Sequence, residues 1–237
     1  DKAAERGRTA TARANSARGR MSLEFFGHPF SSYTQKALIA LWADGTPFEY
    51  RTLDQEHPEN SEELKRHSPF GLFPLLLDDR KPVLEATCII EHLQAHHPGP
   101  NTWIPDGELG RRVRFLDRFF DLHVMENMQK IATDPLRPAA SRDVFGVEAA
   151  HHRLNIAYDW IEEQLGEPWA AGETFTLADC AAAPSLFYAD WVEPIGETRP
   201  KLSAYRARLL AHPNVARAVD EGRPYRAFFP LGAPDRD

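Results

Sequence analysis

The chain has 237 residues and a net charge of −7, and its 42% apolar and 27% charged side chains are ordinary for a soluble globular protein. No apolar run approaches the roughly 18 residues of a transmembrane helix, so we expect neither a membrane span nor a membrane partner. Residues 1–20 carry six Lys or Arg against two acids, which leaves an acidic body that disfavours nucleic acid as the main partner.

The first 21 residues are predicted to be a disordered basic leader. Residues 1–20 contain no Leu, Ile, Val or aromatic side chain, so they cannot contribute to a hydrophobic core. We expect the folded part of the chain to begin after Met21.

An α/β domain is predicted over residues 22–99, in the order β-α-β-α-β-β-α. The expected elements are a strand at 23–26, a helix at 32–43, a strand at 48–52, a weak helix at 59–67, strands at 73–77 and 82–84, and a helix at 87–96. A β-α-β start requires a parallel strand pair, and a tight turn at 78–81 makes the last two strands an antiparallel hairpin. A mixed four-stranded sheet with helices on its faces follows.

The second half of the chain, after a linker at 100–108, is predicted to be an all-helical domain over residues 109–237. Helical periodicity appears at 109–132 and 147–165, and further helices begin near residues 176 and 199, the last ending at His212-Pro213. The start near residue 176 is unusually clear. Thr176 suits the N-cap, and Asp179 can reach back to the N–H of the cap residue.

Three segments resemble motifs of the cytosolic glutathione S-transferase family, in the family's order and spacing. Residues 68–76 (SPFGLFPLL) resemble its N-P-x-G-x-x-P-x-L segment, and residues 83–93 (VLEATCIIEHL) resemble its L-x-E-S-x-A-I-x-x-Y-L segment. Residues 174–179 (TFTLAD) match its S/T-x-A-D capping motif. The resemblance covers about residues 22–225. It implies a thioredoxin-like, glutathione-binding domain at 22–99 and a cytoplasmic homodimer that uses glutathione as cosubstrate in detoxification.

The resemblance implies that a hydroxyl in the turn GHPFSSY activates the glutathione thiol, as in serine-type (bacterial, tau, zeta or theta-like) members. Ser31 precedes Lys36 by five residues, as the serine of S-P-F-x-x-R members precedes their arginine. A four-residue offset also occurs in the family and would select Ser32, but we favour Ser31. The tyrosine-using classes would need Tyr where Phe25 and Phe26 stand, and cysteine-using members would need Cys at residue 31.

By the same resemblance, the main glutathione-binding residues lie at two turns of the chain. Phe73 would pair its backbone with the cysteinyl part, beside a cis Pro74. Glu85 opens a helix whose free N–H groups and dipole favour an anion, and this corner would hold the γ-glutamyl end.

Two positions depart from the family pattern. Ala86 stands where the family usually has a hydroxyl donor, and Leu72 stands where a polar residue is common. We therefore expect weaker glutathione binding unless neighbouring polar side chains compensate; the candidates are Thr87, Lys36 and His57. The alternative function is a non-catalytic binding or interaction protein that keeps the fold with a weakened glutathione site.

The expected reaction is conjugation of the glutathione thiolate to a small hydrophobic electrophile. Substitution, addition, dehalogenation and isomerisation all remain open. By analogy with the family, the electrophile pocket would include Phe30, His123 and Asn127.

No metal site is predicted, and the cysteines are expected to be structural. His92 and His96 are spaced i, i+4 with His97 adjacent, but no H-E-x-x-H pattern and no obvious third ligand accompany them. Cys88 and Cys180 fall in apolar helical patterns, which indicates small buried side chains in a reducing, cytoplasmic compartment.

Overall fold

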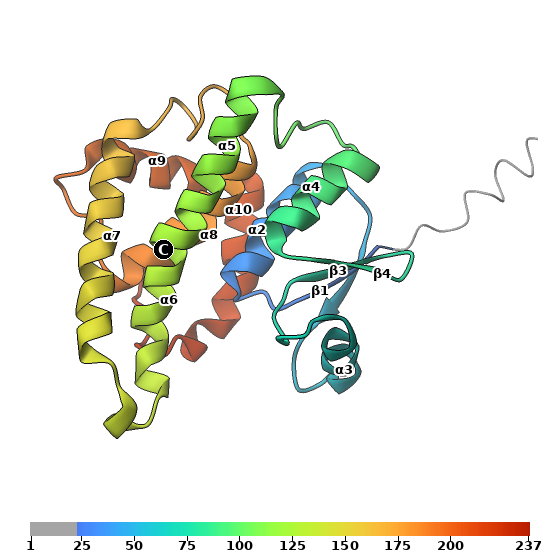
Figure 1. Ribbon diagram of the computed structural model, residues 1–237, viewed down its shortest axis with the longest axis horizontal. Coiled ribbons are helices and arrows are strands. Elements are labelled where there is room, and N and C mark those ends of the chain that lie inside the picture. The colour runs from blue at the N-terminus through green and yellow to red at the C-terminus, as the bar shows by residue number, and fades with distance from the viewer. Residues whose placement is uncertain (1–22) are drawn as a thin grey trace, which may run out of the picture.

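A four-stranded mixed sheet lies in the N-terminal half of the computed structural model, which describes residues 23–237 (Figure 1). The strand order is β2-β1-β3-β4. Strand β1 (Leu23–Gly27) pairs in parallel with β2 (Glu49–Thr52) and antiparallel with β3 (Leu75–Asp78), which forms a hairpin with β4 (Lys81–Leu84). The predicted topology is confirmed. The predicted leader lies outside the described residues.

The third strand begins two residues later than the sequence pattern indicates. Pro74 has no N–H to donate to a strand ladder, so hydrogen-bonded pairing starts at Leu75. Along β3 the side chains alternate between the two faces of the sheet. Leu76 packs with the cluster of α2 and α4, whereas Leu75 and Leu77 pack with Leu64 of α3.

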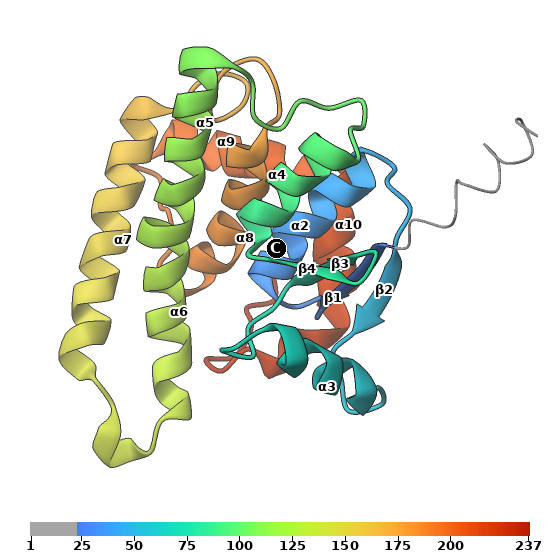
Figure 2. The same cartoon turned by 45° about the vertical axis from the view of Figure 1, so that its right-hand side comes forward.

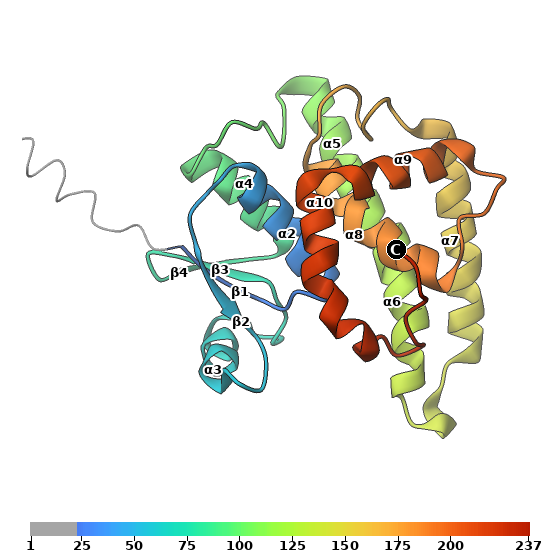
Figure 3. The same cartoon turned by 180° about the vertical axis from the view of Figure 1, so that it is seen from behind.

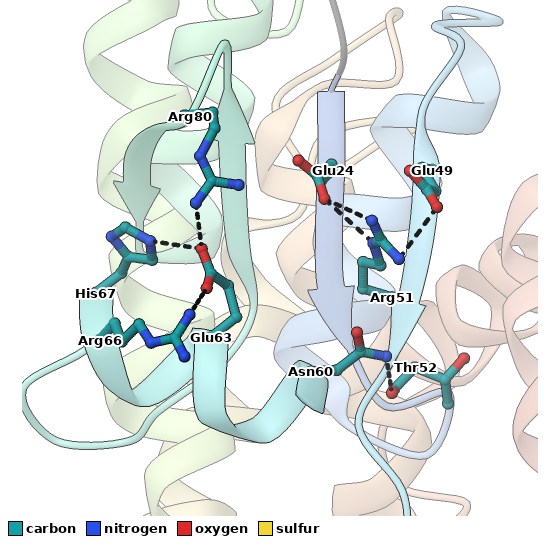
Figure 4. A network of polar contacts seen from close by, with 9 residues as sticks. All are labelled: Glu24, Glu49, Arg51, Thr52, Asn60, Glu63, Arg66, His67 and Arg80. Atoms are coloured by element: carbon teal, nitrogen blue, oxygen red, sulfur yellow. Dashed lines mark hydrogen bonds and ion pairs between the residues drawn. The ribbon is translucent and has the colours of Figure 1, made fainter. Parts of the chain in front are cut away.

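Helices α2 (Ser32–Ala43) and α4 (Ala86–His96) cover one face of this sheet, and α3 (Pro58–His67) covers the other (Figure 2). Polar contacts hold α3 in place, since it buries little apolar surface apart from Leu64. Asn60 donates to the carbonyl of Thr52 at 2.8 Å, and Arg80 of the β3–β4 turn donates to Glu63 at 2.8 Å (Figure 4). The helix that the sequence predicts only weakly is therefore attached by side-chain hydrogen bonds.

The C-terminal half is helical, as predicted. It contains α5 (Gly107–Phe119), a π-helical segment (Phe120–Met125), α6 (Glu126–Thr133), α7 (Val144–Gln164), α8 (Leu177–Val192), α9 (Pro200–Ala211) and α10 (Pro213–Gly222). Helix α8 lies at the centre of the C-terminal core and also reaches the N-terminal half. The Tyr188 hydroxyl donates to the carbonyl of Phe30 at 2.9 Å and accepts from Gln35 of α2 at 3.2 Å.

Helix α10 is absent from the sequence prediction, which ends the last long helix at His212-Pro213. Pro213 instead occupies the first turn of a new helix, where its missing N–H costs nothing. Helix α10 lies beside α2 (Figure 3), with the guanidinium of Arg217 4.0 Å from the ring centre of Trp42. The boundaries at 99–109 between the two halves stay a prediction.

The two cysteines differ in exposure. Cys180 is buried in α8, as expected, but the expectation for Cys88 is wrong because its side chain is exposed. The buried stripe of α4 is formed by Ala86, Ile89, Ile90 and Leu93, and Cys88 falls outside this stripe. Both thiols are free. Within residues 23–237, every helix is too short or too polar to cross a lipid bilayer.

Candidate active site

Ser31 lies at the junction between β1 and α2. Its backbone is extended (φ −86°, ψ 126°), and its Oγ accepts the N–H of Thr34 at 3.3 Å, so it is the N-cap of α2. The side chain is partly exposed and faces a cavity of about 560 Å³. Ser32 is buried, with 6% exposure, and is not part of the cavity lining. The placement therefore favours Ser31 over Ser32 as the hydroxyl that can meet a ligand.

The cavity is formed by three helix starts and one loop. Besides Ser31, its lining includes Phe73, Pro74, Glu85 and Ala86 of the N-terminal half, so these five predicted site residues share one cavity. The remaining lining comprises Tyr33, segment 68–70, Leu72 and Leu84, together with Glu126 and Gln129 of α6. The cavity thus lies between the sheet-containing half and the helical half.

The loop and helix start on the far side of the cavity have the expected backbone form. The Phe73–Pro74 peptide bond is cis, as predicted. Glu85 has a left-handed backbone (φ 69°) and is the N-cap of α4. A non-glycine residue in this conformation is uncommon and is found disproportionately at ligand sites. Because no side-chain hydrogen bond caps α4, the first N–H groups of the helix are available to an anion.

Lys36 and Thr87, the expected compensating side chains, are not in the lining of the cavity. Lys36 is 1% exposed, and its Nζ lies 2.7 Å from Asp117 and 2.6 Å from Asp121. Thr87 accepts from Lys36 at 2.9 Å and donates to Asp117 at 2.9 Å. Both side chains form their hydrogen bonds within a buried polar cluster that joins α2 and α4 to α5.

The two acids of this buried cluster share one lysine. Burial is the main cause that raises the pKa of Asp121 to about 6, and the charge of Asp117 adds to it, although Lys36 opposes both. Lys36, the member of the cluster on α2, lies five residues after Ser31. The cluster therefore fixes the orientation of the helix whose start carries the serine.

His57 and Phe30 are also outside the lining. His57 precedes α3 and its Nδ1 contacts Asp54 at 2.8 Å, which holds the half-exposed ring at that helix start. Phe30 packs edge-on against Tyr188, with ring centres 5.4 Å apart, so it points toward α8 rather than into the cavity.

The expected electrophile-pocket residues His123 and Asn127 do not line the cavity either. His123 is exposed beside Phe119, and Asn127 is buried, donating to the carbonyl of His123 at 2.8 Å. The helical stretch around them is irregular, since residues 120–125 are π-helical. Glu126 and Gln129 of the following helix α6 line the cavity instead.

Tyr33 and Glu126 are lining residues that sequence reasoning missed. Burial, with the nearby charges of Asp121 and Glu126, raises the pKa of the Tyr33 phenol, which therefore stays neutral. Among the described residues, the lining contains two carboxylates and no Lys or Arg. Tyr33 lies only two residues after Ser31, and this proximity is a sequence signal for its place at the cavity. No signal in the sequence places Glu126 there.

Comparisons with known proteins agree with the motifs. The family model described as the glutathione S-transferase N-terminal domain matches residues 25–101, and that of the C-terminal domain matches residues 124–213. Glutathione S-transferase PARB of Nicotiana tabacum is 23% identical over 85% of this chain and 99% of its own. Glutathione S-transferase GstB of Escherichia coli (strain K12) is 24% identical over 83% of this chain and 97% of its own.

Solved structures show the same similarity. A glutathione S-transferase from Methylobacterium radiotolerans, in complex with glutathione sulfonate, has a TM-score of 0.71 and 26% identity over 84% of this chain and 94% of its own. Glutathione transferase F7 from Populus trichocarpa has a TM-score of 0.72 at 19% identity, over 84% and 99% of the two chains. At that identity the likeness shows the fold alone.

Proposed function

The chain belongs to the glutathione S-transferase family, and on this premise we propose that it is a glutathione transferase whose Ser31 activates the glutathione thiol. One observation carries the proposal. Ser31, the loop at cis-Pro74 and the start of α4 at Glu85 all line the same cavity. A thiol-activating hydroxyl, a backbone pairing edge and an anion-binding helix start are thus available to one small ligand.

Ser31 can supply the hydrogen bond that a thiolate needs. A free thiol has a pKa of about 8.5 and is mostly protonated at neutral pH. The Oγ of Ser31 accepts the N–H of Thr34, and among residues 23–237 no acceptor takes its own proton, which is free to be donated to sulfur. Such a bond contributes about 1.5–3 kcal/mol and the N-terminus of α2 about 0.3–1 kcal/mol. Together they lower a thiol pKa by roughly two units.

The other lining groups would hold the tripeptide around the sulfur. The backbone N–H and C=O of Phe73 can pair with the cysteinyl residue, and the first N–H groups of α4 can bind the γ-glutamyl carboxylate. Glu85 can pair with the ammonium group of the same end. Because the described lining offers no Lys or Arg and Ala86 has no hydroxyl, we expect glutathione to bind about ten- to a hundred-fold more weakly than to a site with both donors.

The exposed apolar side chains of the cavity suit a small hydrophobic electrophile. Phe70 and Leu72 are 84% and 63% exposed, and both line the cavity together with Leu84. Apolar surface next to an activated thiolate favours substitution or addition on an uncharged, hydrophobic substrate. We further propose a homodimeric, cytoplasmic enzyme of detoxification, on family membership and on the two free thiols.

The test combines glutathione binding with turnover. Thermal unfolding of the full chain is followed with increasing glutathione up to millimolar concentrations, and conjugation of glutathione to an aryl halide is assayed. Wild type should be stabilised and active. Ser31→Ala should lose ten- to a hundred-fold in kcat/KM, and Ser32→Ala, the buried neighbour, should stay within about threefold of wild type.

The remaining outcomes distinguish a glutathione transferase from a non-catalytic protein. Stabilisation without turnover would support a non-catalytic glutathione-binding protein, which the comparisons do not favour. Neither stabilisation nor turnover would refute the enzyme. Loss of activity in Ser32→Ala alone would move the activating role to Ser32.

A further inference from the structure

A cluster of two histidines and one aspartate lies at the C-terminal end of α4, away from the Ser31 cavity. The Nε2 atoms of His92 and His97 lie 2.8 and 2.7 Å from the same oxygen, Oδ2, of Asp78. The ligand-forming atoms of the three residues all lie within 4.8 Å of one another. Along α4, His92 and His97 lie about 10 and about 18 Å of axial rise beyond Glu85 at the cavity.

Each of the three side chains is held in place by a different feature of the fold. Asp78 ends β3 and is paired with Leu23 and Lys81, and the alternation along the strand turns it to the same face as Leu76, toward α4. His92 lies on the last full turns of α4. His97 is the C-cap, with φ −132° and ψ 52°.

The non-helical backbone of His97 explains how two histidines five residues apart converge. In a continuous helix they would project about 140° apart and could not reach one atom. The sequence pattern pairs His92 with His96 by the i, i+4 rule, but His96 is exposed and its ring lies tilted beside that of His92, with ring centres 4.5 Å apart. The missing third ligand of the sequence analysis is Asp78, which lies 14 residues before His92.

We propose that Asp78, His92 and His97 form a binding site for a divalent zinc ion. Two imidazole nitrogens and one carboxylate oxygen are a ligand set that zinc accepts, with a water molecule completing a tetrahedron. The side chains are 15%, 21% and 11% exposed, so the site is sheltered yet can be reached from solvent. The ion would take the place of the direct contacts that now join the two imidazoles to the carboxylate.

The three ligand atoms already lie within 4.8 Å of one another, so a tetrahedral site needs shifts of about an ångström in side-chain positions. Zinc bonds of about 2.0–2.1 Å in a tetrahedron place ligand atoms about 3.3 Å apart, so each Nε2–Oδ2 distance of 2.7–2.8 Å widens by about half an ångström. A bound ion would link the end of α4 to β3 across the sheet face. Mg²⁺ and Ca²⁺ prefer oxygen ligands and should not bind.

Calorimetric titration of the metal-stripped full chain with Zn²⁺ tests the proposal, with thermal unfolding as a second readout. Wild type should bind one Zn²⁺ per chain and unfold at a higher temperature with Zn²⁺, whereas Mg²⁺ should have no effect. His97→Gln should lower the Zn²⁺ affinity at least tenfold, as should His92→Gln and Asp78→Asn. Glutamine keeps an N–H donor toward Asp78, so the fold should be retained. His96→Gln, the matched control on the same helix, should stay within about twofold of wild type.

Three results would overturn the proposal. The first is the absence of stoichiometric Zn²⁺ binding by wild type, and the second is equal binding by wild type and the three ligand variants. The third is an equal loss in His96→Gln, which would refute this ligand set. If a ligand variant fails to fold, Co²⁺ bound to wild type decides. It should give the intense visible absorption of a four-coordinate ion, and the faint spectrum of a six-coordinate ion would refute the site. None of these measurements depends on transferase activity.

Discussion

Helices α2 and α8 both begin on a hydroxyl side chain, yet the surroundings of the two hydroxyls differ. Ser31 accepts one backbone N–H and faces a cavity of about 560 Å³. Thr176 is 1% exposed, and its Oγ1 donates to Asp179 at 3.1 Å. Both residues suit the N-cap by type. A hydroxyl that already donates a hydrogen bond within the protein is a structural cap, whereas one whose proton is free to be donated to a ligand is a catalytic candidate.

At the start of α8, the polar groups around the N-cap are all paired in hydrogen bonds. Asp179 is completely buried and accepts hydrogen bonds from the backbone N–H groups of Ala170 and Thr176 and from the hydroxyl of Tyr205. Burial is the main cause that raises the pKa of this carboxyl. Every donor around it is matched, so no group remains to bind a ligand. The α2 start keeps one donor unmatched beside a cavity.

The largest expected effect is on stability at the α8 start. Asp179→Ala leaves the donors of Ala170, Thr176 and Tyr205 buried without a partner, and each unmatched donor costs about 1–3 kcal/mol. We expect the free energy of unfolding in urea to fall by at least about 3 kcal/mol. Tyr205→Phe removes one donor only and should cost about 1 kcal/mol. A loss below 1 kcal/mol in Asp179→Ala would show that the cap is not a structural anchor.

A second comparison sets the two caps directly against each other. Thr176→Ala should lower the free energy of unfolding by about 1–2 kcal/mol, because the lost hydroxyl also donates to Asp179. Ser31→Ala should lower it by only about 0.5–1 kcal/mol. In the glutathione conjugation assay the order of the two losses reverses: Ser31→Ala should lose activity, whereas Thr176→Ala should retain the wild-type kcat/KM. Equal losses of activity in two folded variants would abolish the distinction between the caps, and Thr176→Ser is the control that keeps the donor.

The pH dependence of stability tests the buried cluster that orients α2. The pKa of Asp121 is raised from 3.8 to about 6, so the folded state binds its proton more tightly than the unfolded state. Stability from this group is therefore full below about pH 4 and is lost as pH rises through 6. Between pH 7.5 and pH 5.0, wild type should gain about 1.4 kcal/mol of unfolding free energy relative to Asp121→Asn. Parallel pH profiles for the two proteins, measured by urea unfolding, would contradict this assignment.

The fold could be predicted largely because its signals are local. Alternation in the strands, the tight turn at 78–81 and the start of α8 each lie within a few residues of sequence. The same holds for Ser31, Phe73, Pro74, Glu85 and Ala86, which stand at motif-bearing turns and share the cavity. These turns lie close together because the β-α-β-α-β-β-α order brings the starts of α2 and α4 to the same end of the sheet.

The cavity lining differs from the sequence prediction where distant residues or irregular helices determine the local geometry. Lys36 looks available in sequence, but its partners Asp117 and Asp121 lie more than 80 residues away. Glu126, directly after the π-helical segment, lines the cavity, whereas His123 inside that segment does not. At His97 the helix ends, and an i, i+4 rule does not apply beyond the end. Local patterns carry no information on any of these three features.

The smallest expected effect concerns a third helix start, that of α4. Ala86 lines the cavity and is 4% exposed, and a serine there would add the hydroxyl donor that this helix start lacks. One new hydrogen bond contributes about 0.5–1.5 kcal/mol, so Ala86→Ser should bind glutathione about two- to tenfold more tightly in a calorimetric titration. Ala95→Ser, on the exposed side of the same helix, should bind as wild type does. If Ala86→Ser binds no better than Ala95→Ser, the γ-glutamyl carboxylate does not lie at the α4 start, and the cavity holds glutathione in another orientation.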